Sequence, residues 1–148
     1  MEIDLAGKTA IVTGGGQGLG AATARVLAEA GSTVIVTYFD DAEGVNRRRA
    51  EEEAAGIGEC GVAMEADVRD PAAVGAMFDQ VLERYGCVDI VVNNAGINRD
   101  RTMKKMSQEE WQEVIDTNLT GTFNMCRKAA EAMSNGGRIV NVSSLSGV

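Results

Sequence analysis

Five short runs of apolar residues, rich in valine and isoleucine, recur along the chain between longer segments of mixed polarity. Within each run the apolar residues are nearly continuous rather than alternating. That pattern is typical of strands buried on both faces of a sheet. The runs predict strands over Thr9–Thr13, Thr33–Tyr38, Gly61–Glu65, Val88–Asn93 and Arg138–Val142.

The segments between the runs carry helix patterns and helix boundary signals. Asp70 followed by Pro71 is a capping residue before a proline that fits a first helical turn. Ser107 followed by Glu110 has the spacing of a capping box. The predicted helices are Gly18–Ala30, Ala42–Ala55, Pro71–Tyr85 and Gln108–Met133, the last after a turn around Thr102–Met106.

Strand and helix alternate from residue 8 onward, with no repeat, low-complexity segment or linker. This order predicts an α/β fold: a doubly wound parallel sheet with helices on both faces, joined by right-handed crossovers. The last predicted strand is followed at once by the short segment Ser143–Val148. Since such folds place their ligands in the loops after the strands, we expect residues 1–148 to be the N-terminal five βα units of a larger single domain.

Charge and composition exclude several kinds of function. The chain has 14 basic and 22 acidic residues, a net charge of -8, so we expect no binding to nucleic acid or to an anionic membrane. Without an apolar leader or a membrane-length apolar run, a cytoplasmic location is expected. The chain has no histidine, which excludes Ser-His-Asp hydrolysis and histidine-ligated metals, and its three scattered cysteines support no metal site.

A glycine-rich segment, Gly14–Gly20, directly follows the first predicted strand and opens the first helix. Such a turn lets a helix N-terminus approach a diphosphate, although a tight strand-to-helix turn alone would also explain the glycines. An acidic residue about 20 positions later often holds a ribose, and Asp40 lies at that distance. Asp40 or Asp41 could instead cap the next helix, and both alternatives stay open.

Four motifs follow one another along the chain: Thr13-Gly14-x-x-x-Gly18-x-Gly20, then Asn93-Asn94-Ala95-Gly96, then Asn118 within the long helix, then Ser144 after the fifth strand. Together and in this order they resemble the short-chain dehydrogenase/reductase family, whose members have a Rossmann fold. The resemblance covers essentially the whole chain. Within the family, Asn98-Arg99-Asp100 and the stretch from Glu110 to Leu119 look most like 3-oxoacyl-acyl-carrier-protein reductases of fatty acid biosynthesis and acetoacetyl-CoA reductases.

The resemblance implies a nicotinamide dinucleotide as cofactor and assigns residues to it. Asp67 and Val68 would flank the adenine, with Asp67 accepting from its amino group, although Asp67 could simply cap a turn before Pro71. The residues expected around the diphosphate and nicotinamide ribose are Gly14, Gly16, Gln17, Gly18, Leu19 and Gly20, and those expected along the cofactor cleft are Asn94, Ala95 and Gly96.

The choice between NAD and NADP depends on the residues near the adenosine ribose. By the resemblance, Tyr38 occupies the position where NAD-preferring relatives carry an aspartate, so a 2′-phosphate would not be repelled there. On the other side, Gln17 stands in the glycine turn where an arginine would favour the phosphate, and Asp40 and Asp41 are close in sequence. NADP is slightly favoured over NAD.

The resemblance also assigns part of a catalytic apparatus. Asn118 would kink its helix and hold a water of the proton relay. Ser144 would hydrogen-bond the substrate carbonyl oxygen, with neighbouring Ser143 as the alternative. The family's Tyr-x-x-x-Lys pair is absent, because neither Tyr38 nor Tyr85 has a lysine four residues on. We expect the pair beyond Val148 and the chain alone to be inactive.

The implied reaction is reduction of a small-molecule or acyl-thioester ketone, such as 3-oxoacyl-acyl-carrier protein or acetoacetyl-CoA, by NAD(P)H. The full-length protein is expected to be a homodimer or homotetramer that pairs through the helix Gln108–Met133. The alternative is a dinucleotide-binding module without catalysis.

Overall fold

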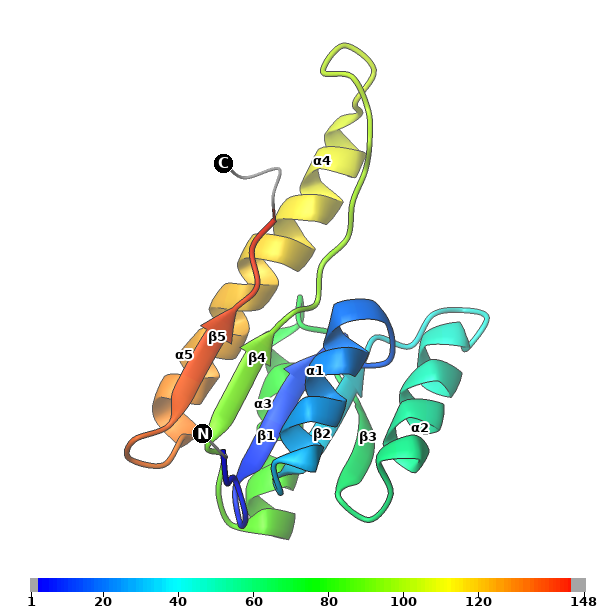
Figure 1. Cartoon of the computed structure of the whole chain (residues 1–148). Helices are drawn as coiled ribbons and strands as arrows, with labels where there is room; N and C mark the ends of the chain where they lie inside the picture. The colour runs from blue at the N-terminus through cyan, green and yellow to red at the C-terminus, as the bar shows by residue number, and fades with distance from the viewer. Residues whose placement is uncertain (1–2, 145–148) are drawn as a thin grey trace.

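The computed structural model of the chain describes residues 3–144 and contains one five-stranded parallel sheet, in the order β3-β2-β1-β4-β5 (Figure 1). The strands are β1 (Thr9–Thr13), β2 (Thr33–Tyr38), β3 (Gly61–Glu65), β4 (Ile90–Asn93) and β5 (Arg138–Asn141). The chain builds the sheet outward from β1 to β3, then crosses back to place β4 on the other side of β1. The strand order therefore reverses between β1 and β4, which is where open α/β sheets form their ligand crevice.

Helices cover both faces of the sheet, as predicted. In Figure 1, α1 (Gly18–Glu29) and α2 (Val45–Ile57) lie in front of the sheet, and α3 (Pro71–Tyr85) and α5 (Gly121–Ala132) lie behind it. Alternate residues of β1 enter separate cores: Ala10 and Val12 pack in one cluster and Ile11 in the other. The continuous apolar pattern of β1 follows from this two-sided burial.

The predicted long helix is confirmed, and it is interrupted around Asn118, where the sequence analysis expects a kink. It consists of α4 (Gln108–Val114), a π-helical segment η1 (Ile115–Thr120) and α5, and its first part extends beyond the carboxyl edge of the sheet (Figure 1). The capping box is present: Ser107 Oγ accepts from the Glu110 N–H at 3.1 Å, and Glu110 Oε2 accepts from the Ser107 N–H at 3.1 Å. Among residues 3–144, no helix has both the length and the apolar character to cross a membrane.

The start of α2 differs from the predicted one. The helix begins at Val45 rather than Ala42, because the Asp41 carboxylate accepts from the backbone N–H groups of Val45 at 3.2 Å and Asn46 at 2.7 Å. These hydrogen bonds lower the pKa of Asp41, that from Asn46 contributing most. Of the two alternatives for the acidic pair, Asp41 is therefore a helix-capping residue.

The prediction that all five strands are buried on both faces is wrong for β5, and it holds only in part for β3, where Met64 alone is buried. Every residue of β5 is exposed, including the apolar Ile139 and Val140. The strand lies at the edge of the sheet and α5 packs against it from one side (Figure 1). Its apolar sequence fits two-sided burial, but within the described residues no element covers its other face or its outer edge.

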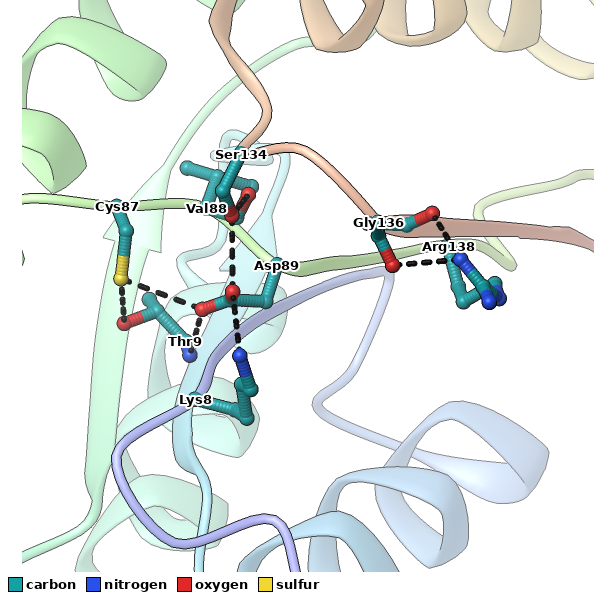
Figure 2. A network of polar contacts seen from close by, with 9 residues as sticks. Lys8, Thr9, Cys87, Val88, Asp89, Ser134, Gly136 and Arg138 are labelled. Atoms are coloured by element: carbon teal, nitrogen blue, oxygen red, sulfur yellow. Dashed lines mark hydrogen bonds and ion pairs between the residues drawn. The ribbon is translucent and has the colours of Figure 1, made fainter.

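A hydrogen-bonded network closes the amino edge of the sheet (Figure 2). The buried Asp89 carboxylate accepts from the Thr9 N–H at 3.0 Å, the Ser134 hydroxyl at 2.8 Å and Lys8 Nζ at 3.2 Å, and from the Cys87 thiol at 3.2 Å. Burial alone would raise the pKa of Asp89, but these donors outweigh it and lower the pKa to about 2. One carboxylate thus ties β1, β4 and the α5–β5 connection together.

Candidate functional site

A cleft of about 300 Å³ opens at the carboxyl edge of the sheet, at the reversal of strand order. The loops after β1, β2, β3 and β4 border it, together with the side of α4. Eight of the predicted cofactor residues border this cleft: Gly14, Gly16, Gln17, Tyr38, Asp67, Val68, Ala95 and Gly96. The predicted residues Gly18, Leu19, Gly20, Asn94, Asn118 and Ser144 are not among those that border it.

The glycines after β1 serve different purposes. A Cβ on Gly20 would lie 2.5 Å from Asn94 Nδ2 and 2.5 Å from the Gly14 carbonyl oxygen, so this glycine lets α1 pack onto the turn. A Cβ on Gly16 would lie 2.8 Å from the backbone nitrogen of Ala50, so Gly16 lets α2 approach the turn. Gly18 has φ +54° and nothing within 4 Å of its Cβ position, which leaves open space beside the start of α1.

A hydrogen-bonded link between β1 and β4 holds the turn in place. Thr13 Oγ1 accepts from the N–H groups of Asn94 at 3.0 Å and Ala95 at 2.9 Å. The Asn94 side chain donates to the carbonyl oxygens of Thr13 at 2.9 Å and Gly14 at 3.2 Å. Asn94 is therefore a positioning residue behind the cleft, while Ala95 and Gly96 form part of its wall.

Asn118 acts on the same wall from the long helix. Its Oδ1 accepts from the Ile97 N–H at 2.8 Å and its Nδ2 donates to the Ile97 carbonyl oxygen at 3.0 Å. The side chain thus satisfies both backbone polar groups of Ile97, as a neighbouring strand would. Asn118 lies inside the π-helical segment, which is a common feature near functional sites. The preceding residue, Thr117, borders the cleft. Ser144 lies three residues beyond the end of β5 and is exposed.

Charged and aromatic side chains gather where β2 and β3 end. The Asp67 carboxylate forms an ion pair with Arg69, whose Nη2 lies 2.7 Å from Asp67 Oδ2. The hydrogen bond from the Arg69 side chain is the main cause that lowers the pKa of Asp67. The Arg69 guanidinium carbon lies 4.8 Å from the centre of the Phe39 ring, and both residues border the cleft.

A second group of polar residues joins α2 to the glycine turn. Arg49 and Asn46 border the cleft, and Arg49 Nη1 donates to Gln17 Oε1. Asp40 does not border the cleft and pairs instead with Arg47 Nη2 at 3.0 Å. The Asp40 carboxylate is therefore paired outside the cleft, whereas the Arg49 guanidinium contacts the glycine turn.

Sequence reasoning missed several residues that border the cleft. The additional lining residues are Thr37, Phe39, Asn46, Arg49, Ala66, Arg69, Ile97, Arg99, Glu113 and Thr117. Two of them had a usable signal: Arg69 follows Asp67 by two positions with opposite charge, and Arg49 belongs to a run of three arginines on one helix. In the part of the chain that the structure describes, no group of acidic or cysteine side chains is arranged to hold a metal ion.

Comparison with known proteins extends this picture. A family model described as short chain dehydrogenase matches residues 8–148. The acetoacetyl-CoA reductase of Paracoccus denitrificans is 45% identical over 95% of the chain, and a 3-oxoacyl-acyl-carrier-protein reductase of Staphylococcus aureus is 41% identical over 95%. The 3beta-hydroxysteroid dehydrogenase 1 of Eggerthella lenta is 45% identical over 98%. The chain spans 56 to 57% of the length of these relatives.

Solved structures share the fold. A short chain dehydrogenase from Burkholderia cenocepacia, crystallised in complex with NADP, superposes with a TM-score of 0.84 at 37% identity, over 98% of this chain and 58% of that one. A short-chain dehydrogenase/reductase from Brucella melitensis superposes with a TM-score of 0.90 at 27% identity, over 99% and 60%.

Proposed function

The chain belongs to the short chain dehydrogenase family, and we propose that its protein is an NAD(P)H-dependent ketoreductase that acts on a 3-oxoacyl thioester. The observation that carries the proposal is the cleft at the strand-order reversal, bordered together by the glycine turn, the Asp67-Val68 loop and the Ala95-Gly96 wall. The acetoacetyl-CoA reductase and 3-oxoacyl-acyl-carrier-protein reductase among the relatives support the substrate class.

The start of α1 fits the diphosphate of such a cofactor. Its N-cap residue, Gln17, makes no side-chain capping bond, and the first turn contains no acidic residue. Within the described residues, neither the N-cap side chain nor an acidic residue of the first turn therefore occupies the positive end of the helix dipole. With the open space beside Gly18, this is the arrangement in which helix N-termini bind phosphate groups.

We assign a role in the proposed reaction to individual residues of the site. When bound, the dinucleotide would supply the hydride. Asn118 would keep the β4–α4 loop in position by holding both polar groups of Ile97. Ser144 would donate a hydrogen bond to the substrate oxygen, where negative charge develops. The general acid of the family's Tyr-x-x-x-Lys pair is not among the 148 residues.

The arrangement around Arg49 favours NADP over NAD. A 2′-phosphate carries negative charge, and Arg49 borders the cleft beside the glycine turn. Asp41 is turned toward the α2 N-terminus and Asp40 is paired with Arg47, so neither carboxylate opposes the phosphate from the cleft. Gly16 contributes indirectly, because it allows α2 to approach the turn closely enough for Arg49 to contact Gln17.

Titration of NADPH and NADH by cofactor fluorescence tests the proposed site. We expect both to bind, NADPH more tightly, and Arg49→Gln to weaken NADPH binding about tenfold while NADH binding changes little. Arg48→Gln is the matched control, because Arg48 lies one position away on the same helix and donates to the Glu43 carbonyl oxygen instead. Failure of both cofactors to bind a folded chain would contradict the dinucleotide site. Tighter binding of NADH would contradict only the preference.

We also infer that the 148 residues are the first five βα units of a larger single domain. The exposed apolar strand β5 and the greater length of the relatives support this. A homo-oligomer is proposed for the full-length protein, supported by the exposed apolar side chains of Trp111, Leu119 and Phe123 along the long helix.

A further inference from the structure

A polar cluster with one cysteine lies between β4, β5 and α5, apart from the residues that border the cleft. Asn93 at the end of β4 and Asn141 at the end of β5 are paired in register. Asn93 Nδ2 donates to Asn141 Oδ1 at 2.8 Å and to Sγ of Cys126, a residue of α5, at 3.3 Å. The Cys126 thiol donates to Asn141 Oδ1 at 3.7 Å. The Cys126 sulfur is therefore in contact with two amide side chains.

This cluster lacks one hydrogen-bond donor. Asn93 is 5% exposed, and the contacts with Asn141 and Cys126 use both hydrogens of its Nδ2. Its Oδ1 is buried and accepts no hydrogen bond from any residue that the structure describes. Buried side-chain oxygens are paired in the large majority of cases. The amide group that donates to the Cys126 sulfur can thus accept one further donor.

The three cysteines are all free and half-buried, but their surroundings differ. Cys87 donates to the Asp89 carboxylate at 3.2 Å at the amino edge of the sheet (Figure 2), and that negative charge would repel an attacking sulfur anion. Cys60 lies in the turn before β3. Of the three sulfurs, only that of Cys126 accepts from an N–H group of a described residue. Cys126 is therefore the cysteine at which an attacking sulfur has an amide donor beside it.

We propose that Cys126 is a site of oxidation by hydrogen peroxide, and that the Asn93 side chain holds the resulting sulfenic acid. The sulfur attacks one peroxide oxygen, so that an S–O bond forms while the O–O bond breaks. The departing hydroxide combines with the thiol proton and leaves as water. The sulfur loses two electrons and the peroxide gains them. The new S–OH hydroxyl is a hydrogen-bond donor, and Asn93 Oδ1 is the buried acceptor that lacks one. The proposal does not depend on the dinucleotide function.

Treatment of the folded chain with hydrogen peroxide, followed by dimedone trapping and peptide mass spectrometry, tests the proposed site. We expect sulfenic acid to form about tenfold faster at Cys126 than at Cys60 or Cys87, which serve as internal controls. In the urea-unfolded chain the three rates should be similar, because the amide contacts are lost. Equal labelling of the three cysteines in the folded chain would overturn the proposal. So would a preference for Cys126 that persists in urea, because it would not come from the fold.

Two variants test the role given to the amide groups. Asn93→Leu removes both the donor to the sulfur and the acceptor for the new hydroxyl at nearly constant volume. It should slow sulfenic acid formation at Cys126 about tenfold and shorten the lifetime of the acid, measured by adding dimedone after increasing delays. Asn141→Asp, on the exposed strand β5, places a negative charge beside the sulfur without changing a buried residue, and should also slow the oxidation.

The same two changes at Asn135 are the matched controls, because Asn135 is exposed in the turn between α5 and β5. Asn135→Leu and Asn135→Asp should leave the oxidation rate of Cys126 unchanged. Circular dichroism establishes that each variant is folded. A rate at Cys126 that stays unchanged in folded Asn93→Leu or Asn141→Asp, or that falls equally in the Asn135 controls, would contradict the part assigned to the amide cluster.

Discussion

The polar groups at the two edges of the sheet differ in whether the chain itself provides their hydrogen-bond partners. At the amino edge, the Asp89 carboxylate receives donors from three separate segments and is closed off from solvent (Figure 2). At the carboxyl edge, the first turn of α1 has no acidic residue, and open space lies beside Gly18. Hydrogen bonds within the chain thus stabilise the amino edge of the sheet, whereas the carboxyl edge leaves the start of α1 open to a ligand.

The residues that stabilise the fold and the residues proposed to bind the cofactor therefore lie at opposite edges of the sheet. Substitutions at the amino edge should change the free energy of unfolding and leave cofactor affinity unchanged. Substitutions in the open part of the carboxyl edge should change cofactor affinity, because the proposed site places side chains and N–H groups there against a ligand.

The largest effect is expected for catalysis at the carboxyl edge. The 148 residues contain no tyrosine with a lysine four positions on, so the chain as written should bind cofactor but show no measurable ketoreductase activity. General acid assistance alone is worth about 10²–10⁴-fold in rate. The measurement follows NADPH absorbance with acetoacetyl-CoA, and compares this chain with one extended through the expected Tyr-x-x-x-Lys pair. Comparable turnover by the two chains would show that the catalytic assignment is wrong.

The next largest effect is expected for Asp89→Ala at the amino edge. The substitution leaves the donors of Thr9 and Ser134 without their acceptor, and should lower the free energy of unfolding by about 3 kcal/mol. Urea unfolding measures the change, with Asp79→Ala as a control because Asp79 is an exposed aspartate that pairs with Lys128. NADPH affinity of the folded protein should stay the same. A loss of affinity without a loss of stability would break the proposed separation of the edges.

The same carboxylate predicts a dependence of stability on pH. The pKa of Asp89 is about 2 in the folded chain, against an ordinary value of 3.8. Because the folded pKa is the lower one, the ionised group stabilises the fold above about pH 4, and this contribution is lost as the pH falls toward 2. Its size is about 2 kcal/mol. The stability difference between the unaltered chain and Asp89→Asn, measured by urea unfolding at successive pH values, should therefore shrink over that range. A constant difference would contradict the role of Asp89.

Much of the fold could be predicted because it depends on local patterns. β1, β2, β3 and α3 have the bounds that the sequence predicts, since continuous apolar runs and the Asp70-Pro71 start are strong signals. The exposure of β5 could not be predicted, because an apolar run shows what a strand can bury and not whether a neighbour is present to cover it. Asn118 marks the place of a kink in the sequence, but the pairing of its side chain with the distant Ile97 inside a π-helical segment is not contained in helical periodicity.

The parts of the candidate site that carry a sequence motif could be predicted. The side chains that reach the cleft from other elements, such as α2, could not. The glycine turn, Asp67 and the Ala95-Gly96 wall carry motif signals, and they border one cleft. Arg49 reaches that cleft from the second turn of a helix, through the packing that Gly16 permits. Which of three consecutive arginines faces the turn is set by the exact start of α2, which Asp41 determines.

The smallest expected effect gives the sharpest comparison of the two edges, because the chain offers a matched pair of glycines. Gly7, before β1, has φ +74° and Gly18, at the start of α1, has φ +54°, and neither has an atom within 4 Å of its Cβ position. Alanine at either position should therefore cost a similar backbone strain of about 1 kcal/mol in the free energy of unfolding. Only Gly18→Ala places its methyl group in the space expected to hold the diphosphate, so only this variant should weaken NADPH binding. Thermal unfolding and fluorescence titration of both variants provide the measurements. Equal NADPH affinity in the two variants would mean that the open space beside Gly18 is not the diphosphate site.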